Sequence, residues 1–468
     1  MTARSAPAVG ILGAGYMGLA TGLAFAHHGR TVWAFDISPK VMGALRRRRS
    51  PYAEVGLNEL LRAEMARGRF RAAVSQHDLV ARSPVIFVCL PTPRGPGGRI
   101  DLRPMRAGLG ELARELSATP GYRLVVIKST VVPGTTQEVL EPLLRRASGR
   151  SPRELGIATN PEFLAEGTMV RDALFPERVV IGVSDRRSRR TLRKVYAGFR
   201  APILELPPSG AELVKYASNA FLAVKVSFAN EVGRISERLG QDVDRVMDAV
   251  GADSRIGKKF LRAGPGFGGS CFDKDVRALL ARARELGEEF RTAESALRTN
   301  DEQIDHVLRL VERHVGSLRG KTIAVLGVAF KAGTDDVRES RAFPIVRRLR
   351  SAGARVRLYD PVALSNFSRE WVRGGWGKAS NLRIARTPEA AVRGADAAVL
   401  QADWPEFRDW SHDWTRAMRH PLLIDLRRQV SAEVAARSGL RLVGLGVGRT
   451  EPTAGAERAK RVRRGRRP

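Results

Sequence analysis

The feature that most constrains the fold lies near the start of the chain, where an apolar run is followed at once by spaced glycines. Residues 9–12 have the composition of a buried strand, an apolar helix follows the glycine segment and extends through Ala26, and a second strand over 31–35 ends at Asp36. The first turn and helix start carry three glycines: Gly13, Gly15 and Gly18. Strand, glycine loop, helix, strand and terminal acid together are typical of a dinucleotide-binding βαβ unit. We therefore predict that the chain begins with a doubly wound α/β domain.

Each part of this motif has a separate chemical use. Gly13 permits a tight turn, Gly15 lets the backbone approach a pyrophosphate at the helix N-terminus, and Gly18 lets helix and strand pack closely. A carboxylate at Asp36 would accept hydrogen bonds from the adenosine ribose and repel a 2′-phosphate. The pattern therefore favours NAD over NADP. The alternative to a cofactor site is a purely structural glycine turn with an aspartate at the strand end.

Three later strands of the same domain end in polar or turn-forming residues. A strand over 85–90 is followed by Pro91-Thr92-Pro93, which we expect to border the cofactor because ligands gather at the carboxyl ends of parallel strands. Cys89 lies within this strand and is interpreted as a packing residue. A strand over 124–127 is followed by the hydroxyls of 129–136, which either bind a ligand or cap the next helix. A strand over 179–183 is expected to close the sheet.

Two pairs of polar residues have a spacing of four. Glu162 and Glu166 would lie on one face if their segment is helical, where they either reach one site or form a solvated surface. An apolar helical pattern runs over 211–239, longer than a usual globular helix, and is typical of a connector between domains. On it Lys215 and Asn219 either lie along the apolar stripe or donate hydrogen bonds to a substrate oxygen.

A glycine-rich loop, residues 264–270, leads directly into a cysteine. Four of the six residues from 264 to 269 are glycine, so backbone can approach a ligand closely there. Cys271 follows at an expected helix start, where the helix dipole and Lys274 favour the nucleophilic thiolate. The flanking glycines, lysine and aspartates favour a reactive thiol over a buried structural one.

The last third of the chain repeats the strand and helix pattern. Strands are expected over 322–327, 355–359, 397–401 and 422–426. The first turn lacks the three-glycine spacing, so we predict a second doubly wound unit used for something other than NAD. Its loop supplies Lys331 and Arg338, which suit phosphate or another anion.

Composition limits the remaining classes of protein. A chain of 468 residues is expected to form two or three domains. The net charge of +31 suggests a nucleic-acid ligand, but arginine is scattered, aromatic residues are only 6% and no nucleic-acid motif occurs, so we do not expect one. The sequence contains neither an export signal nor an apolar run of membrane-spanning length, which predicts a cytoplasmic protein. The two cysteines do not suggest a disulfide framework, and residues 451–468 are predicted to form a disordered basic tail.

These segments together resemble the UDP-glucose/GDP-mannose dehydrogenase family over nearly the whole chain, to about residue 449. The resemblance is carried by the segments GAGYMGL, KSTVVPGTT, NPEFLAEG, KYASNAFLAVKVSFANE, GFGGSCFDKD and GVAFKAGTDDVRES. Residues 253–266 are most similar to the UDP-glucose branch and differ from the GDP-mannose and UDP-N-acetylmannosamine branches. Leu426 departs from the pattern, because the family usually has glycine there, and a bulkier residue is expected to alter the nucleotide end of the pocket.

The resemblance implies an α/β fold with two Rossmann-like doubly wound domains joined by a long central helix. The implied domains are an N-terminal NAD-binding domain (1–205), a central helical dimerisation domain with the cysteine loop (206–300), a C-terminal nucleotide-sugar domain (301–450) and the tail. Arg255 matches a family arginine that reaches the sugar of a neighbouring subunit, which implies a homo-oligomer, at least a dimer. No metal is implied.

The implied activity is an NAD-dependent four-electron oxidation of a sugar C6 hydroxyl to a carboxylate, on UDP-glucose or on a sister nucleotide sugar. Cys271 would carry a thiohemiacetal and then a thioester, Lys215 and Asp275 would handle proton and oxyanion, and Glu162 would activate water. Supporting catalytic roles fall to Thr130, Asn219 and Glu166.

The binding residues are implied in the same way. For the cofactor they are Gly13, Gly15, Tyr16, Met17, Gly18, Asp36, Lys40, Pro91, Thr92, Thr130, Glu166, Lys274 and Arg338. For the nucleotide sugar they are Glu162, Phe163, Leu164, Ala165, Glu166, Lys215, Asn219, Arg255, Phe260, Gly266, Phe267, Gly268, Phe330, Lys331 and Arg427.

Overall fold

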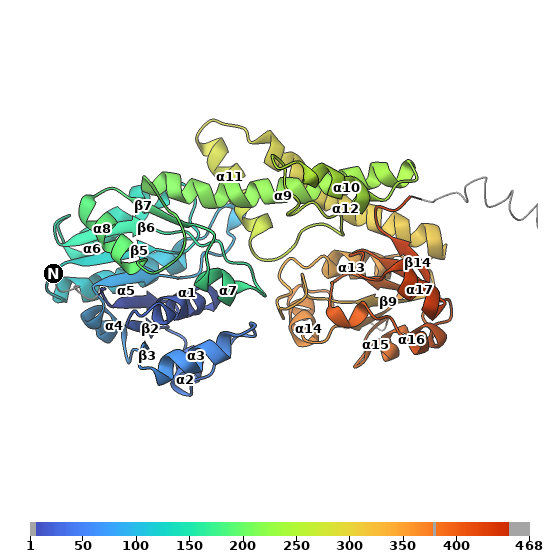
Figure 1. Cartoon of the computed structure of the whole chain (residues 1–468), viewed down its shortest axis with the longest axis horizontal. Coiled ribbons are helices and arrows are strands. Elements are labelled where there is room, and N and C mark those ends of the chain that lie inside the picture. The colour runs from blue at the N-terminus through green and yellow to red at the C-terminus, as the bar shows by residue number, and fades with distance from the viewer. Residues whose placement is uncertain (1–5, 378–380, 449–468) are drawn as a thin grey trace, which may run out of the picture. The chain divides into compact units, whose positions relative to one another are not determined.

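The computed structural model describes residues 6–377 and 381–448, so the predicted basic tail lies outside the described residues. The chain divides into two units (Figure 1). Unit 1 consists of Met1–Asn219 and Lys274–Glu289, and unit 2 of Ala220–Asp273 and Phe290–Pro468. Each unit is built on one mainly parallel sheet, which confirms the predicted pair of doubly wound folds. The finer boundaries at 205 and 300 stay a prediction.

The described part of unit 1 forms an eight-stranded sheet in the order β3-β2-β1-β4-β5-β6-β7-β8. Its strands are β1 (Val9–Leu12), β2 (Val32–Phe35), β3 (Phe70–Ala72), β4 (Val85–Val88), β5 (Arg123–Ile127), β6 (Leu155–Thr159), β7 (Val179–Val183) and β8 (Ile203–Leu206). Neighbouring strands are parallel except β6 and β7, which are antiparallel. The expectation that residues 179–183 close the sheet is wrong, because β8 pairs with the outer edge of β7. Strand β8 is half-exposed at the edge of the sheet, so its sequence lacks the continuous apolar run that indicates a buried parallel strand.

Helices cover both faces of this sheet. They are α1 (Tyr16–His27), α2 (Pro39–Arg46), α3 (Leu57–Ala66), α4 (Gln76–Arg82), α5 (Arg103–Ala118), α6 (Glu141–Ser148), α7 (Met169–Leu174) and α8 (Arg186–Val195), with short helical turns at Pro96–Gly98 and Thr136–Leu140. Apolar side chains of α1, α3 and α8 pack on one face, and those of α4, α5 and α6 on the other. Strands β1 and β4 are buried throughout, as expected of parallel strands covered on both sides.

Unit 2 contains a six-stranded parallel sheet in the order β11-β10-β9-β12-β13-β14, within the described residues. Its strands are β9 (Thr322–Leu326), β10 (Arg355–Tyr359), β11 (Leu382–Ile384), β12 (Ala397–Leu400), β13 (Leu422–Asp425) and β14 (Arg441–Gly444). Its helices are α10 (Val243–Ala252), α12 (Arg291–Val315), α13 (Ala342–Ser351), α14 (Leu364–Arg373), α15 (Pro388–Val392), α16 (His412–Ala417) and α17 (Ala432–Ser438), with a short turn at Pro405–Phe407. Apolar residues of α10 and α12 share one core with β9 and α13.

Two helices contribute residues to both units. The long helix α9 (Pro208–Arg238) has 31 residues and passes from unit 1 to unit 2 after Asn219 (Figure 1). This confirms the predicted central helix, whose length of about 46 Å follows from 1.5 Å per residue. Helix α11 (Phe272–Glu285) begins in unit 2 and continues in unit 1 from Lys274.

A buried carboxylate joins α9 to the loop after β5. Glu212 is 2% exposed, and its carboxylate accepts hydrogen bonds from the backbone N–H groups of Gly134 at 2.7 Å and Thr136 at 3.0 Å and from the Thr136 hydroxyl. Burial raises the pKa of Glu212 to about 7 from 4.5, although these hydrogen bonds oppose the shift. The carboxylate therefore fixes the loop that follows Thr130 to the helix that carries Lys215.

This shift predicts how stability changes with pH. Because the pKa of Glu212 is higher in the folded chain, its contribution to stability is complete below about pH 4.5 and is lost as pH rises through 7. We expect the free energy of unfolding of the wild type, relative to Glu212→Gln, to fall by up to about 3 kcal/mol between pH 4.5 and 8. Thermal unfolding of both proteins across this range measures the difference, and a difference independent of pH contradicts the prediction.

Candidate functional site

The glycine loop between β1 and α1 leaves one open position among three glycines. Gly13 has φ +95°, and a Cβ placed there would lie 2.6 Å from the carbonyl oxygen of Cys89. A Cβ at Gly18 would lie 2.0 Å from the carbonyl oxygen of Gly13. By contrast, a Cβ at Gly15 would meet nothing within 4 Å. Protein packing therefore requires the first and third glycines, and the second leaves space for an incoming group.

Asp36 lies at the end of β2, where the motif predicts it. Its carboxylate accepts hydrogen bonds from the backbone N–H groups of Ala14 and Ser38, both at 2.8 Å. A carboxylate has about four acceptor positions, so two remain for ribose hydroxyls. The Tyr16 ring contacts the Tyr52 ring in a tilted arrangement with 4.2 Å between ring centroids, and Lys40 is exposed at the start of α2.

The loops after β4 and β5 are joined at the carboxyl ends of these strands. The hydroxyl of Ser129 donates to the carbonyl oxygen of Leu90 at 2.6 Å, next to Pro91 and Thr92. Thr130 follows, half-buried, and the N-cap of the next helical turn is Thr135. The sequence leaves capping and ligand binding as alternatives for the hydroxyls of residues 129–136 as a group. Thr135 of this group occupies the cap position without a capping side-chain hydrogen bond, and ligand binding by Thr130 stays a prediction.

Buried polar side chains converge from α9, α11 and the loop after β6. Lys215 is 4% exposed and its Nζ lies 2.9 Å from Oε1 of Glu162. Asn219 donates to Oδ2 of Asp275 at 2.7 Å, and Lys274 donates to Oδ1 of the same carboxylate at 2.6 Å. Lys215 is thus not a surface residue with its amine in water, because its charge is buried against a carboxylate. The structure brings together these predicted catalytic residues of unit 1.

The segment 160–167 is not helical, so the condition under which Glu162 and Glu166 would lie on one helix face is not met. It is irregular over 160–165 directly after β6 and turns at 166–168, and α7 starts only at Met169. Glu162 is instead held by Lys215 and by the backbone N–H of Leu164. Burial opposes its ionisation, but Lys215, this hydrogen bond and Lys128 together hold the pKa of Glu162 below its ordinary value. Glu162 is therefore a mostly buried, ionised carboxylate.

The glycine-rich cysteine loop belongs to unit 2 and packs against residues 328–341. A Cβ at Gly268 would lie 2.3 Å from the carbonyl oxygen of Glu339, and one at Gly269 would lie 2.8 Å from the Phe330 ring. Gly266 has φ +104°. The sequence predicted that the backbone of this loop approaches a ligand closely. At Gly268 and Gly269 the backbone instead approaches the protein's own carbonyl of Glu339 and ring of Phe330. Cys271 is exposed and directly precedes α11.

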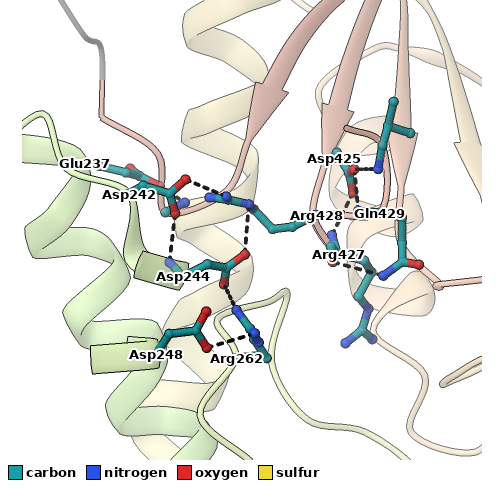
Figure 2. Close-up of polar contacts among 11 residues, drawn as sticks. Glu237, Asp242, Asp244, Asp248, Arg262, Asp425, Arg427, Arg428 and Gln429 are labelled. Atoms are coloured by element: carbon teal, nitrogen blue, oxygen red, sulfur yellow. Dashed lines mark hydrogen bonds and ion pairs between the residues drawn. The ribbon is translucent and has the colours of Figure 1, made fainter. Parts of the chain in front are cut away.

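The turn after β13 fixes Arg427. Figure 2 shows the Asp425 carboxylate, which accepts hydrogen bonds from the backbone N–H groups of Arg427, Gln429 and Val430. The Arg427 guanidinium donates to the carbonyl oxygens of Gln401 at 2.6 Å and Phe330 at 3.3 Å.

The residues on either side of Arg427 face other parts of unit 2. Arg428 extends away from it and pairs with Asp242 at 2.8 Å and Asp244 at 3.3 Å on α10 and its N-cap (Figure 2). Leu426 is fully buried in the apolar core of unit 2, so the residue that replaces the usual glycine is accommodated by the core.

The remaining predicted residues are mostly accessible. Arg255 is exposed and forms an ion pair with Asp253 at 2.6 Å, and Arg338 binds the Asp336 carboxylate. Lys331 lies 5.7 Å from the centre of the Phe330 ring, and Phe260 is exposed with φ +63°. The predicted residues thus divide between the two units. Among the described residues, no cluster of His, Cys, Asp or Glu suits a metal ion, and no helix is long and apolar enough to cross a membrane.

Three family models cover most of the chain. The models of the UDP-glucose/GDP-mannose dehydrogenase family match as its NAD binding domain at residues 7–200, its central domain at 209–302 and its UDP binding domain at 324–432. The chain belongs to this family. It is an NAD-dependent dehydrogenase.

Similar proteins extend over nearly the same length. UDP-glucose 6-dehydrogenase AglM of Haloferax volcanii is 40% identical over 90% of this chain and 96% of its own, and UDP-glucose 6-dehydrogenase of Rhizobium meliloti is 38% identical over 93% and 98%. A UDP-glucose dehydrogenase structure from Pyrobaculum islandicum has a TM-score of 0.86 at 37% identity, covering 93% of this chain and 98% of that one. A UDP-D-ManNAc dehydrogenase structure from Pyrococcus horikoshii has a TM-score of 0.80 at 27% identity, covering 94% and 99%.

The geometry of the dehydrogenase fits NAD at the first glycine loop. The space at Gly15 lies directly before Tyr16, the first residue of α1, where N–H groups are available to a pyrophosphate. Asp36 retains acceptor positions for the ribose. Sequence reasoning missed Lys128, Asn160 and Glu212, which are buried polar residues beside the site. Lys128 is the first residue of the segment KSTVVPGTT, but no sequence pattern indicates that it is buried.

The open position at Gly15 gives a test of cofactor contact. Gly15 has φ −67° and ψ −174°, a conformation that alanine also adopts, so Gly15→Ala should leave the unfolding temperature unchanged. The added methyl group would fill the approach to the pyrophosphate, and we expect NAD to bind at least about tenfold more weakly, or ~1.4 kcal/mol.

The matched control is Gly110→Ala, in α5, where a Cβ likewise meets nothing within 4 Å. It should keep NAD affinity and raise stability by about 0.5–1 kcal/mol. Calorimetric titration with NAD compares the variants. Unchanged affinity in Gly15→Ala would show that the cofactor does not approach this backbone.

Proposed function

We propose that this dehydrogenase oxidises the C6 hydroxyl of UDP-glucose to a carboxylate and so produces UDP-glucuronate. The relatives at 38–40% identity are named UDP-glucose 6-dehydrogenases. By sequence, residues 253–266 also resemble that branch of the family. The alternative is a sister nucleotide-sugar dehydrogenase, since a UDP-D-ManNAc dehydrogenase shares the fold at 27% identity. The observation that carries the proposal is the exposed Cys271 directly before α11, the helix that also carries Lys274 and Asp275.

In the first oxidation the chain's residues bind the C6 oxygen and remove its proton. Lys215 donates a hydrogen bond to this oxygen, and Asp275, oriented by Asn219 at 2.7 Å, receives the proton through water. Bound NAD supplies the hydride acceptor, and each sugar requires two molecules of it because the overall change removes four electrons. The product of this step is an aldehyde at C6.

In the second oxidation Cys271 keeps the aldehyde covalently attached. The thiolate forms a bond to the aldehyde carbon, and the carbonyl electron pair moves to oxygen, which is protonated to a thiohemiacetal. Loss of this proton and of the C6 hydride, for which the second NAD would be the acceptor, leaves a thioester. Glu162 then takes a proton from water as the water adds to the thioester carbon. The carbon–sulfur bond breaks and the thiolate is regenerated. Thr130 and Glu166 support this site by polar contacts.

The binding groups of unit 2 supply the proposed contacts to the nucleotide. Lys331 and Arg427 offer cationic donors to the diphosphate, and Phe330 offers an apolar surface. The backbone of residues 266–268 and Phe260 would border the sugar. The fixed position of Arg427, whose guanidinium donates to two carbonyl oxygens, supports its role as a pre-ordered donor.

We also propose that the enzyme is a homo-oligomer, at least a dimer, and that it works in the cytoplasm. Large apolar residues on α9 are exposed at spacings of seven or eight: Leu213, Phe221, Phe228 and Ile235. Residues at this spacing share one helix face, and an exposed apolar stripe of this kind favours packing against another chain. Arg255 is exposed and so accessible to a neighbouring subunit.

A panel of nucleotide sugars tests the proposed substrate. We expect two NADH per UDP-glucose, and kcat/KM for UDP-glucose at least about tenfold above GDP-mannose and UDP-N-acetylmannosamine, a difference of ~1.4 kcal/mol. NADH absorbance and product chromatography provide both measurements. Preference for another sugar would favour the sister activity, and no turnover with any sugar would refute the proposal.

Variants of the two cysteines test covalent catalysis. We expect Cys271→Ser to make UDP-glucuronate at least about a thousandfold more slowly, because a serine hydroxyl is a far weaker nucleophile at neutral pH. Cys89→Ala is the control, because burial raises the pKa of the Cys89 thiol to about 12 and its side chain packs in the core. The control should keep activity, and wild-type uronate formation by Cys271→Ser would exclude the covalent step.

A further inference from the structure

Lys128 is a buried lysine at the carboxyl end of β5 that has no role in the mechanism described above. It is 7% exposed, and its Nζ donates to Oδ1 of Asn160 at 3.0 Å. Asn160 is fixed at the end of β6, because its Nδ2 donates to the carbonyl oxygen of Val180 at 2.7 Å and its backbone N–H to that of Ile127 at 2.8 Å. Tyr196 donates to the same Oδ1. Lys128 is therefore held by Asn160, the residue two positions before Glu162 in the chain.

A hydrogen bond to an amide oxygen does not by itself account for a buried cation. Burying an ammonium group is costly, and a neutral side chain at this position would leave Oδ1 of Asn160 its bond from Tyr196. Burial lowers the pKa of Lys128 to about 8, while the negative charge of Glu162 acts in the opposite direction and the positive charge of Lys215 in the same one. Lys128 therefore stays mostly protonated at neutral pH.

The charged partner that explains Lys128 is Glu162. The titratable groups that act on Lys128 are Glu162, Cys89 and Lys215, and of these only Glu162 carries a negative charge, because burial keeps the Cys89 thiol neutral. The groups that favour the ionised form of Glu162 are Lys215, the Leu164 N–H and Lys128. One carboxylate is thus balanced by two lysines.

The two lysines have different freedom in the proposed reaction. Lys215 pairs with Glu162 at 2.9 Å, but donation to the sugar oxygen requires it to share or leave this contact. Lys128 stays bound to Asn160. We propose that Lys128 is a positioning residue that keeps the Glu162 carboxylate charged and oriented for water activation while Lys215 serves the sugar. This inference rests on the proposed function and assigns a residue to its hydrolytic half.

The test compares the pH dependence of kcat for UDP-glucose oxidation in three variants of Lys128. Lys128→Met and Lys128→Gln remove the charge, and the glutamine retains a donor for Asn160. Without this cation the pKa of Glu162 rises, so the acidic limb of kcat should move to higher pH by at least about half a unit. Lys128→Arg keeps the charge and should keep the wild-type limb. In the two neutral variants below the limb, the thioester on Cys271 should accumulate in acid-quenched samples after a normal first NADH burst.

Tyr196→Phe is the matched control, because it removes the other hydrogen bond to Asn160 Oδ1 without changing the charge. Its pH profile should match the wild type. The proposal is overturned if Tyr196→Phe shifts the limb as Lys128→Met does, if Lys128→Arg shifts it equally, or if both neutral variants keep the wild-type profile. Should Lys128→Met not fold, Lys128→Gln decides. Failure of the wild type to oxidise any nucleotide sugar overturns both this inference and the proposed function, whereas normal wild-type turnover with unshifted neutral variants overturns this inference alone.

Discussion

Charge balance among buried side chains is the constraint on which the site of unit 1 depends. Lys128, Glu162, Lys215 and Asp275 are all largely removed from water, and each would be strongly destabilising there alone. Lys215 pairs with Glu162, Lys274 and Asn219 bind Asp275, and Lys128 supports Glu162. These groups come from β5, the loop after β6, α9 and α11. Their pairing fixes the positions of all four elements relative to one another within unit 1.

The same constraint explains why α9 is anchored so firmly at its start. Glu212 and Lys215 lie three residues apart on this helix, and each is bound to a different loop at the carboxyl edge of the sheet. Glu212 fixes the loop after β5 through backbone N–H groups, and Lys215 fixes the loop after β6 through a carboxylate. The helix thus holds both loops at two points less than one turn apart. A shift of the helix would break a buried ion pair and a buried hydrogen-bonded carboxylate together.

The sequence predicted those parts of the structure in which one residue type is physically required. Gly13 and Gly18 leave no room for a side chain, and the long apolar periodicity of α9 suits only a helix, so both were predicted correctly. The edge strands β3 and β8 are short and half-exposed and have no comparable pattern. The condition that residues 160–167 be helical is not met, because a spacing of four alone does not distinguish a helix from an irregular segment held by side-chain contacts. Lys128 was missed because burial of a polar residue depends on partners from distant segments, here Asn160 and Glu162.

The glycine-rich cysteine loop shows that glycine can be required for a reason other than ligand contact. Gly268 and Gly269 are needed because the carbonyl of Glu339 and the ring of Phe330 occupy the space that side chains would fill. The N–H of Gly269 donates to the carbonyl oxygen of Arg338 at 3.1 Å, which ties the two segments together. Glu339 itself has φ +51°, an unfavourable conformation for a residue with a side chain, and it persists only because the surrounding contacts hold it. Residues 330–339 therefore determine the path of the chain into Cys271. Phe330 and Lys331 belong to this segment, so a ligand that contacts either residue also contacts the segment that positions the cysteine loop.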